Sequence, residues 1–232
     1  MAQSNPKTAD KDADMLNLSI SDAALPLLDA VKKFVTEEVA PIADEYYRLG
    51  EGRKDRWSYA PGQLELLDKA KAKAKTQGLW NFFLPDAETG EGLKNLDYAY
   101  IAAELGRQPL ASECLNCSAP DTGNMEVLER VGTPEQKERW LKPLLNGEIR
   151  SCFGMTEPNL ASSDAKNIGT RAELVGDEWV INGEKYYISG AGDPRCKIMI
   201  CMVKTSPNAP AHRQQSQILV PMNTPEIGRA HV

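Results

Sequence analysis

The sequence predicts a multi-domain α+β fold, in which an N-terminal all-α domain is followed by an antiparallel β-barrel or sandwich. Two observations predict this arrangement. Apolar residues recur at helical spacing up to Gly147, and several short strands separated by turn residues follow from Thr170. We therefore expect four segments: a disordered N-terminus at 1–18, a helical domain at 19–149, a β domain at 150–226 and a separate tail at 227–232.

The charge balance and the apolar runs narrow the class of protein. Thirty-three acidic residues against twenty-seven basic ones give a net charge of −6, which argues against nucleic-acid binding. No apolar run is long enough to cross a bilayer, and the N-terminus lacks the apolar segment of a signal peptide. We therefore expect a soluble intracellular protein, cytoplasmic in the first instance, with mitochondria and peroxisomes as alternative compartments.

The first two expected helices carry clear apolar stripes. One stripe begins at Leu25, and Pro41 should end or kink that helix. The other runs from Leu64 to Ala74, and Gly78 is placed to cap its C-terminus. The lysines of the run KAKAKAK in this second helix occupy alternate positions, which point all round a helix. We interpret this run as a solvated surface rather than as a patch for a membrane or a phosphate.

Three further helices are expected, at residues 96–107, at 122–131 and after Thr133. Thr133 is a suitable N-cap, Pro134 fits the first helical position, and Gln136 completes a capping box. We interpret the aromatic and methionine positions of these helices as core rather than as cofactor contacts. No glycine-rich motif that cradles phosphate is present, which excludes a nucleotide-binding βαβ fold.

The β region is predicted from short runs bounded by turn residues. The expected strands are Thr170–Leu174, Glu178–Ile181, Lys185–Ser189, Lys197–Lys204 and Gln217–Met222. Turns are expected at Val175-Gly176-Asp177 and at Asn182-Gly183, and Asn-Gly is the favoured pair for a type I′ hairpin.

The five cysteines do not form the framework of a secreted protein. Cys114 and Cys117 make a CxxC, which is compatible with a zinc or thiol-redox module. The chain has no second CxxC, and its only histidines are His212 and His231. We therefore favour ordinary thiols, and the scarcity of histidine disfavours a Ser–His or Cys–His catalytic apparatus.

A loop and a hairpin in the β region could bind a flat, heteroatom-edged ring. The loop from Met155 to Asp164 is rich in hydroxyls and small residues, which can donate to carbonyl, ring-nitrogen and phosphate acceptors. On the expected strand after Gly183, Tyr187 and Ser189 would share one face because strand residues alternate.

This segment resembles the flavin-binding motif of the acyl-CoA dehydrogenase family. That motif is roughly MTEPxAGSD followed by GDxYVINGxKxWITNG, and this chain has MTEPNLASSD followed by GDEWVINGEKYYISG. One residue is inserted in the loop, Ser162 stands where glycine is usual, and Tyr187 stands where tryptophan is usual. The form TEPNxxSSD with GAGxPxCKI is most similar to the branch related to acyl-CoA dehydrogenases with a fused kinase-like domain.

The resemblance implies that the chain binds FAD. The cofactor-binding residues that it implies are Phe153, Gly154, Met155, Thr156, Ser162, Ser163, Tyr187, Ile188 and Ser189. It implies that Thr156 bonds the pyrimidine edge, that Ser163 lies near the pyrophosphate or the substrate, that Tyr187 stacks on the ring and that Ser189 lies close to N5. A tyrosine at position 187 keeps a stacking face of smaller area than tryptophan.

The resemblance also implies a reaction and partners. Family members remove the α-proton of an acyl-CoA thioester with a glutamate and pass the β-hydrogen as hydride to flavin N5, in fatty-acid β-oxidation or related catabolism. That glutamate lies in a C-terminal four-helix bundle, so no catalytic residue is expected in this chain, and Glu157 belongs to the flavin loop. Electron-transfer flavoprotein is the implied electron acceptor, and a homotetramer or homodimer is the implied assembly. Metal is not implied.

The final residues suggest that the sequence is a fragment. IGRAHV resembles the translation of a sequencing adapter, so we expect residues 227–232 to be non-native and the chain as given to be inactive. Two alternatives stay open. One is a flavin-dependent acyl-CoA oxidase on the same fold, and the other is a non-catalytic module that binds flavin or acyl-CoA.

Overall fold

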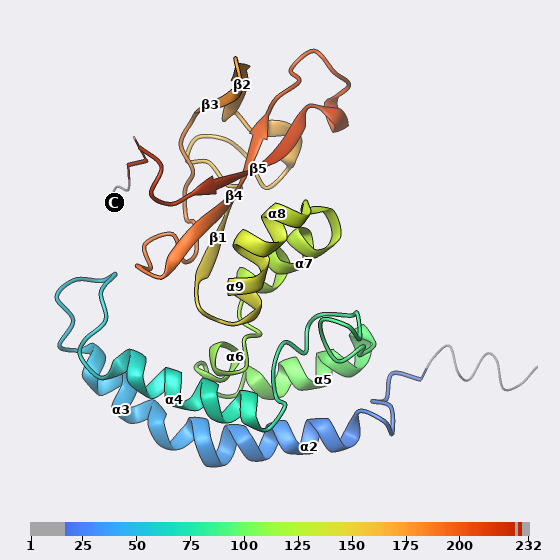
Figure 1. Ribbon diagram of the computed structural model, residues 1–232, viewed down its shortest axis with the longest axis vertical. Coiled ribbons are helices and arrows are strands. Elements are labelled where there is room, and N and C mark those ends of the chain that lie inside the picture. The colour runs from blue at the N-terminus through green and yellow to red at the C-terminus, as the bar shows by residue number, and fades with distance from the viewer. Residues whose placement is uncertain (1–16, 226, 229–232) are drawn as a thin grey trace, which may run out of the picture. The chain divides into compact units, whose positions relative to one another are not determined.

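Helices precede strands in the chain, as the sequence predicts (Figure 1). The computed structural model describes residues 17–225 and 227–228, so most of the expected disordered N-terminus and of the expected tail lies outside the described residues. The helices are α2 (Leu25–Phe34), α3 (Ala40–Gly50), α4 (Gln63–Thr76), α5 (Asn95–Leu105), α6 (Ala111–Cys114), α7 (Asp121–Val131), α8 (Pro134–Gln136) and α9 (Lys142–Leu145). The strands are β1 (Arg150–Gly154), β2 (Arg171–Val175), β3 (Glu178–Asn182), β4 (Cys196–Lys204) and β5 (Gln215–Pro221).

Contacts divide the chain into two compact units. The first unit joins the residues up to Glu45 with Glu65–Leu115, and the second joins Tyr46–Leu64 with the residues from Asn116 onward. The four segment boundaries expected from the sequence stay predictions. Among the described residues, no helix is both long enough and apolar enough to cross a membrane.

The apolar stripe of α4 belongs to the core of the first unit. Leu67, Ala70 and Ala74 are buried, as the helical spacing predicts, and Gly78 has the positive φ of 70° expected of a C-cap. Full burial of one leucine side chain contributes about 1.5–3 kcal/mol, so such a stripe holds the helix in place. The interpretation of the KAKAKAK run as a solvated surface agrees with the exposed Lys69, Lys73 and Lys75, and it is wrong for Lys71, which is buried in an ion pair with Glu113.

Pro41 does not end the first helix. The chain continues from α2 through a π-helical turn, Val35–Val39, and the residue after this turn donates its N–H to Val35, five residues back. Proline lacks an N–H and its ring would clash with the carbonyl four residues earlier, and a widened turn accommodates both defects. A second π-helical turn, Lys137–Leu141, lies at the same spacing before Pro143.

The capping box that begins α8 is confirmed. The Thr133 side chain accepts the Gln136 N–H at 3.3 Å, and the Gln136 side chain accepts the Thr133 N–H at 2.9 Å, with Pro134 at the first helical position. Gly147 follows α9 with φ 66°, which ends the helical part of the chain before β1.

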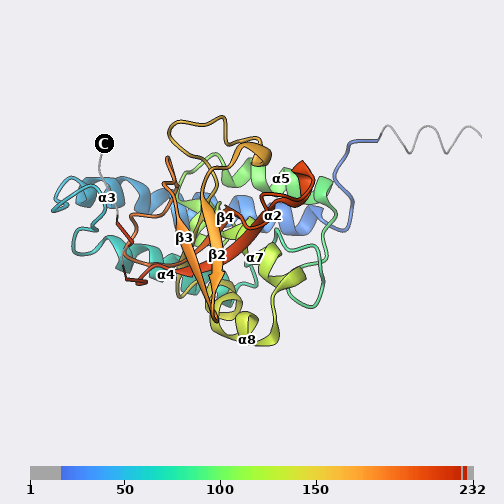
Figure 2. The ribbon, with the colours of Figure 1, turned by 90° about the horizontal axis from the view of Figure 1, so that it is seen from above.

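The second unit contains a mixed sheet, which corrects the antiparallel sheet that we expected. Strand β4 is central: β1 pairs with it in parallel, β2 pairs with it in parallel near its end, and β5 pairs with it antiparallel. Strand β3 then pairs antiparallel with β2, as Figure 2 shows from above. Parallel neighbours need a long connection, and the segment between β1 and β4 is long enough to supply it. Four of the five expected strands overlap β2, β3, β4 and β5, whereas β1 was not expected, and the sequence pattern left the direction of the strands open.

The expected hairpin at Asn182-Gly183 and the expected strand Lys185–Ser189 are both wrong. The hairpin turn lies one strand earlier, at Gly176 with φ 64°, and β3 ends at Asn182 without folding back on itself. Gly183 instead allows a close approach, because a Cβ there would lie 2.3 Å from the Thr170 hydroxyl. Since the next segment leaves the sheet, Tyr187 and Ser189 do not share the face of a strand.

Candidate functional site

The two segments of the predicted flavin site lie side by side within the second unit. The Tyr186 N–H donates to the Thr156 carbonyl at 2.8 Å, and the Thr156 hydroxyl donates to the Tyr186 carbonyl at 2.5 Å. These two bonds join the loop that follows β1 to the segment that follows β3, thirty residues later. The structure therefore brings Thr156 into the neighbourhood of Tyr187, Ile188 and Ser189.

A buried ion pair between Lys185 and Glu157 lies next to the pairing of Thr156 with Tyr186. The Lys185 ammonium donates to Glu157 Oε1 at 2.9 Å and to the Met155 carbonyl at 3.0 Å, and both charged side chains are less than a tenth exposed. Glu157 also accepts the Gly169 N–H at 2.7 Å, the Thr170 N–H at 2.9 Å and the Thr170 hydroxyl at 2.6 Å. The pair thus ties three backbone segments together.

The environment of Glu157 keeps this carboxylate ionised. Burial alone would raise its pKa, but the hydrogen bonds from Thr170, Lys185 and the backbone at Gly169 outweigh burial and lower the pKa to about 2. A carboxylate with such a low pKa is a poor general base at neutral pH. Glu157 therefore has a structural role, as its place in the flavin-loop motif implies.

The two serines of the loop occupy different environments. Ser162 is buried; its hydroxyl accepts the Glu157 N–H at 2.6 Å and donates to the Leu160 carbonyl at 3.3 Å. Its contacts close the loop on itself, so Ser162 shapes the loop. Ser163 is exposed and leaves its hydroxyl available to a ligand.

Tyr187 is presented in an unusual way. It has φ 56°, a region that non-glycine residues rarely occupy, and it is 85% exposed, although its ring contacts Tyr186 edge-on at 4.3 Å. Strained backbone tends to persist at functional sites because the surrounding structure over-determines it. Ser189 is exposed in the next turn, while Ile188 is half-buried against the cluster of Cys152, Cys196 and Met222.

Phe153 and Gly154 belong to β1 rather than to the loop. Phe153 is half-buried, and Gly154 is buried with no space for a side chain, because a Cβ there would lie 2.6 Å from the Met199 sulfur. Met155 is half-buried and contributes its carbonyl to Lys185. These three residues therefore position the loop, and the groups accessible to a ligand come from Thr156, Ser163, Tyr187 and Ser189.

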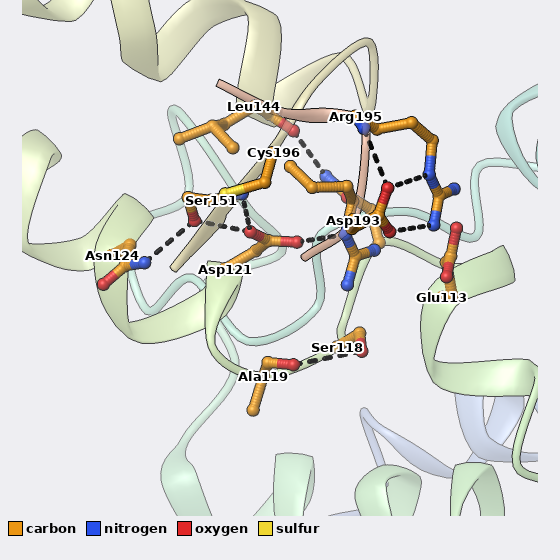
Figure 3. A network of polar contacts seen from close by, with 12 residues as sticks. Glu113, Ser118, Ala119, Asp121, Asn124, Leu144, Ser151, Asp193, Arg195 and Cys196 are labelled. Carbon is orange, nitrogen blue, oxygen red and sulfur yellow. Dashed lines mark hydrogen bonds and ion pairs between the residues drawn. The ribbon is translucent and has the colours of Figure 1, made fainter. Parts of the chain in front are cut away.

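Sequence reasoning missed a buried polar network at the start of β1 (Figure 3). Asp121, the first residue of α7, accepts the Ser151 N–H at 2.7 Å and the Ser151 hydroxyl at 2.5 Å, and it pairs with Arg150 at 2.7 Å. Asn124 donates to the Ser151 hydroxyl at 2.8 Å. The network attaches β1, and hence the loop that follows it, to α7. The sequence signal that could have indicated this network is Asp121, an acidic residue directly before the expected helix at 122–131.

The first cysteine of the CxxC, Cys114, offers little reactivity. Cys114 is buried in the first unit, and burial is the main cause that raises the pKa of its thiol to about 12. Metal binding and disulfide exchange both need the thiolate, which this environment disfavours. In the part of the chain that the structure describes, no group of three or more His, Cys, Asp or Glu residues could hold a metal ion.

The candidate site fits a flavin in the chemistry of its exposed groups. Tyr187 offers an exposed aromatic face, and Ser163 and Ser189 offer exposed hydroxyls. The half-buried Thr156 hydroxyl already donates to the Tyr186 carbonyl and can still accept a hydrogen bond. This combination is suited to a flat ring with polar edges and a phosphate tail.

Comparisons with known proteins agree with this description. The family model for the acyl-CoA dehydrogenase N-terminal domain matches residues 21–148, and the model for the acyl-CoA dehydrogenase middle domain matches residues 152–231. Acyl-CoA dehydrogenase family member 10 of Mus musculus is 49% identical over 213 residues, which are 90% of this chain and 20% of that protein. This similarity confirms the branch that the sequence resembles.

Two solved structures share the fold. A putative acyl-CoA dehydrogenase from Mycobacterium abscessus has a TM-score of 0.81 at 47% identity, over 89% of this chain and 52% of that chain. A glutaryl-CoA dehydrogenase from Mycobacterium smegmatis, solved in complex with FADH2, has a TM-score of 0.64 at 22% identity, over 89% of this chain and 47% of that chain. The chain spans about half the length of these two structures and a smaller share of the mouse protein.

Proposed function

Because the chain belongs to the acyl-CoA dehydrogenase family, we propose that its candidate site forms one side of an FAD site in an enzyme that oxidises acyl-CoA thioesters. The observation that carries the proposal is the pairing of Thr156 with Tyr186, which brings together two motif segments and presents Tyr187 beside them. The relative solved with FADH2 supports the choice of cofactor.

Four residues of the candidate site have proposed roles that their environments support. Tyr187 provides the face on which the ring stacks, and Thr156 provides a hydroxyl and backbone groups for the pyrimidine edge. Ser189 provides a hydroxyl near N5, and Ser163 provides one for the pyrophosphate or the substrate. Ser162 and Glu157 hold the loop in the conformation that these groups need.

When bound, FAD supplies the acceptor for the hydride that leaves the β-carbon of the thioester. The α-proton needs a base that is aligned with the α-carbon, and Glu157 is a poor base because four donors bond its carboxylate and lower its pKa. We propose that the base belongs to the half of the relatives that this chain does not match. The acyl-CoA substrate, electron-transfer flavoprotein as acceptor, a homo-oligomeric assembly and the cellular compartment are part of the same proposal.

Flavin titration tests the role of Tyr187. The full chain is titrated with FAD while flavin fluorescence and visible circular dichroism are recorded, and we expect weak but saturable binding. Tyr187→Ala should weaken binding about twofold to tenfold, because an aromatic contact contributes about 0.5–1.5 kcal/mol beyond its buried area.

Tyr47→Ala is the matched control. Tyr47 is also exposed and also contacts its neighbour, Tyr46, edge-on, but it lies on α3. The control should bind FAD as the wild-type chain does. Equal affinities for Tyr187→Ala and the wild type would remove Tyr187 from the site, and no saturable binding by the wild type would remove the flavin proposal for this chain.

A further inference from the structure

The turn that follows Ser189 is held by a loop more than a hundred residues earlier in the chain. The Tyr59 hydroxyl donates to Asp193 Oδ2 at 2.8 Å and accepts a hydrogen bond from the Arg195 guanidinium at 2.6 Å. The same guanidinium lies 4.7 Å from the centre of the Tyr59 ring and bonds both carboxylate oxygens of Asp193. Figure 3 shows Asp193 and Arg195 turned toward each other.

Trp57 makes the second contact between this loop and the turn. Gly192 has no room for a side chain, because a Cβ there would lie 2.0 Å from the Trp57 ring. The indole therefore packs directly against the backbone at Gly192, which only glycine allows. We call Trp57, Tyr59, Gly192, Asp193 and Arg195 the Tyr59 cluster.

The loop that carries Trp57 and Tyr59 is braced by its own contacts. Asp55 accepts the N–H groups of Trp57 at 2.8 Å and of Ser58 at 2.9 Å, and Gln63 accepts the Ala60 N–H at 2.8 Å. A loop with a fixed internal conformation can hold a partner segment in a fixed position.

Hydrogen bonds within the turn connect the Tyr59 cluster to the candidate site. The Asp193 N–H donates to the Gly190 carbonyl at 3.0 Å, and the Ala191 N–H donates to the Ile188 carbonyl at 3.2 Å. Because the segment from 183 to 189 is not part of a strand, no ladder of sheet hydrogen bonds fixes it. It is held by Thr156 and Glu157 at one end and by the Tyr59 cluster at the other.

We propose that the Tyr59 cluster is a positioning element of the candidate site, which holds the segment from Tyr187 to Ser189 in the conformation that presents their side chains. This inference rests on the proposed function for the identity of the ligand. The left-handed backbone conformation of Tyr187 is strained, and the contacts with Thr156 and Glu157 on one side and the Tyr59 cluster on the other maintain it. Loss of the Tyr59 cluster would let this backbone relax. Residues of the 46–64 stretch thereby act on a site whose motif lies more than ninety residues later.

Two variants test the cluster, each with a matched control in the full chain. Tyr59→Phe removes the hydroxyl that bonds both Asp193 and Arg195, while Tyr100→Phe removes a tyrosine hydrogen bond to Leu18 in the first unit. Gly192→Ala forces the Trp57 ring away, while Gly123→Ala adds a methyl group to α7 where nothing lies within 4 Å.

Hydrogen exchange is measured first, in the protein without flavin. The amides of Ala191 and Asp193 should exchange about tenfold faster in Tyr59→Phe and Gly192→Ala than in the wild type, with no change in either control. Unchanged exchange in both test variants would overturn the proposal.

FAD affinity and the visible circular dichroism of bound FAD form the second readout. For Tyr59→Phe we expect FAD affinity about threefold to tenfold weaker than in the wild type. We also expect a changed dichroism band, because the flavin ring would contact Tyr187–Ser189 in a different conformation. Faster amide exchange together with unchanged FAD affinity and an unchanged dichroism band would overturn the positioning role. The Tyr59 cluster would then only stabilise the local structure. If the wild type binds no FAD while Tyr59→Phe still exchanges faster, the proposed function fails, and the role of the cluster in holding the segment is supported.

Discussion

Loss of Lys185 should destabilise the second unit strongly. In Lys185→Met, the Glu157 carboxylate stays buried and loses the cation that lies 2.9 Å away. Removal of one partner from a buried ion pair costs about 3–5 kcal/mol, because an uncompensated charge remains. Three donors from Gly169 and Thr170 still bond Glu157, so we expect the lower end of that range, about 3 kcal/mol.

Native-state hydrogen exchange measures this loss. The Thr170 amide donates to Glu157 and the Tyr186 amide follows Lys185 directly in the chain. A loss of about 3 kcal/mol accelerates their exchange roughly a hundredfold. Lys142→Met is the control, because Lys142 pairs with Glu138 at 2.7 Å while both side chains are more than 60% exposed. An exposed pair contributes at most about 1 kcal/mol, so the control should change exchange little. A Lys185 variant no more affected than this control would refute the reasoning.

The double variant and the pH dependence sharpen the test. Glu157→Gln combined with Lys185→Met should cost less than the sum of the single changes, because both buried charges are then gone. The pKa of Glu157 is lowered in the fold, so the stabilisation is fully present above its ordinary value of 4.5 and is lost as the pH falls toward about 2. The part of the acid destabilisation that belongs to this window should disappear in Glu157→Gln.

Three further predictions concern the helical part of the chain. Thr133→Ala removes the capping box with Gln136 and should lower the free energy of unfolding by about 1 kcal/mol in urea; an unchanged midpoint would contradict that role. Leu67→Ala, at a fully buried position of α4, should cost about 2–5 kcal/mol in the same assay, and a loss below 1 kcal/mol would place Leu67 outside the core. Cys114 should resist alkylation by iodoacetamide at pH 8 in the native chain and react once the chain is denatured, because burial raises its pKa to about 12; rapid native labelling would show that the thiol is accessible.

Local patterns in the sequence determined the helices and the family. The stripe of α4 repeats at the period of a helix, and Thr133 with Gln136 satisfies the N–H groups of its own first turn, so neither depends on distant residues. The flavin motif likewise depends on residue types at fixed spacing, and the family models confirm the family that it indicates. The roles of the nine site residues stay predictions, and the flavin titration addresses one of them.

Only the tertiary structure decided the path of the segment after Asn182. Asn-Gly followed by alternating residues favours a hairpin, because the local preference of that pair is for a tight turn. In the folded chain, Lys185 bonds the buried Glu157 and Tyr186 pairs with Thr156, and these contacts take the place of the pairing of a short strand with β3. Pairings between residues so far apart in the sequence leave no periodic signal. The parallel pairing of β1 with β4 and the contact of Tyr59 with Asp193 escaped prediction for the same reason: such contacts exist only once the intervening chain has folded.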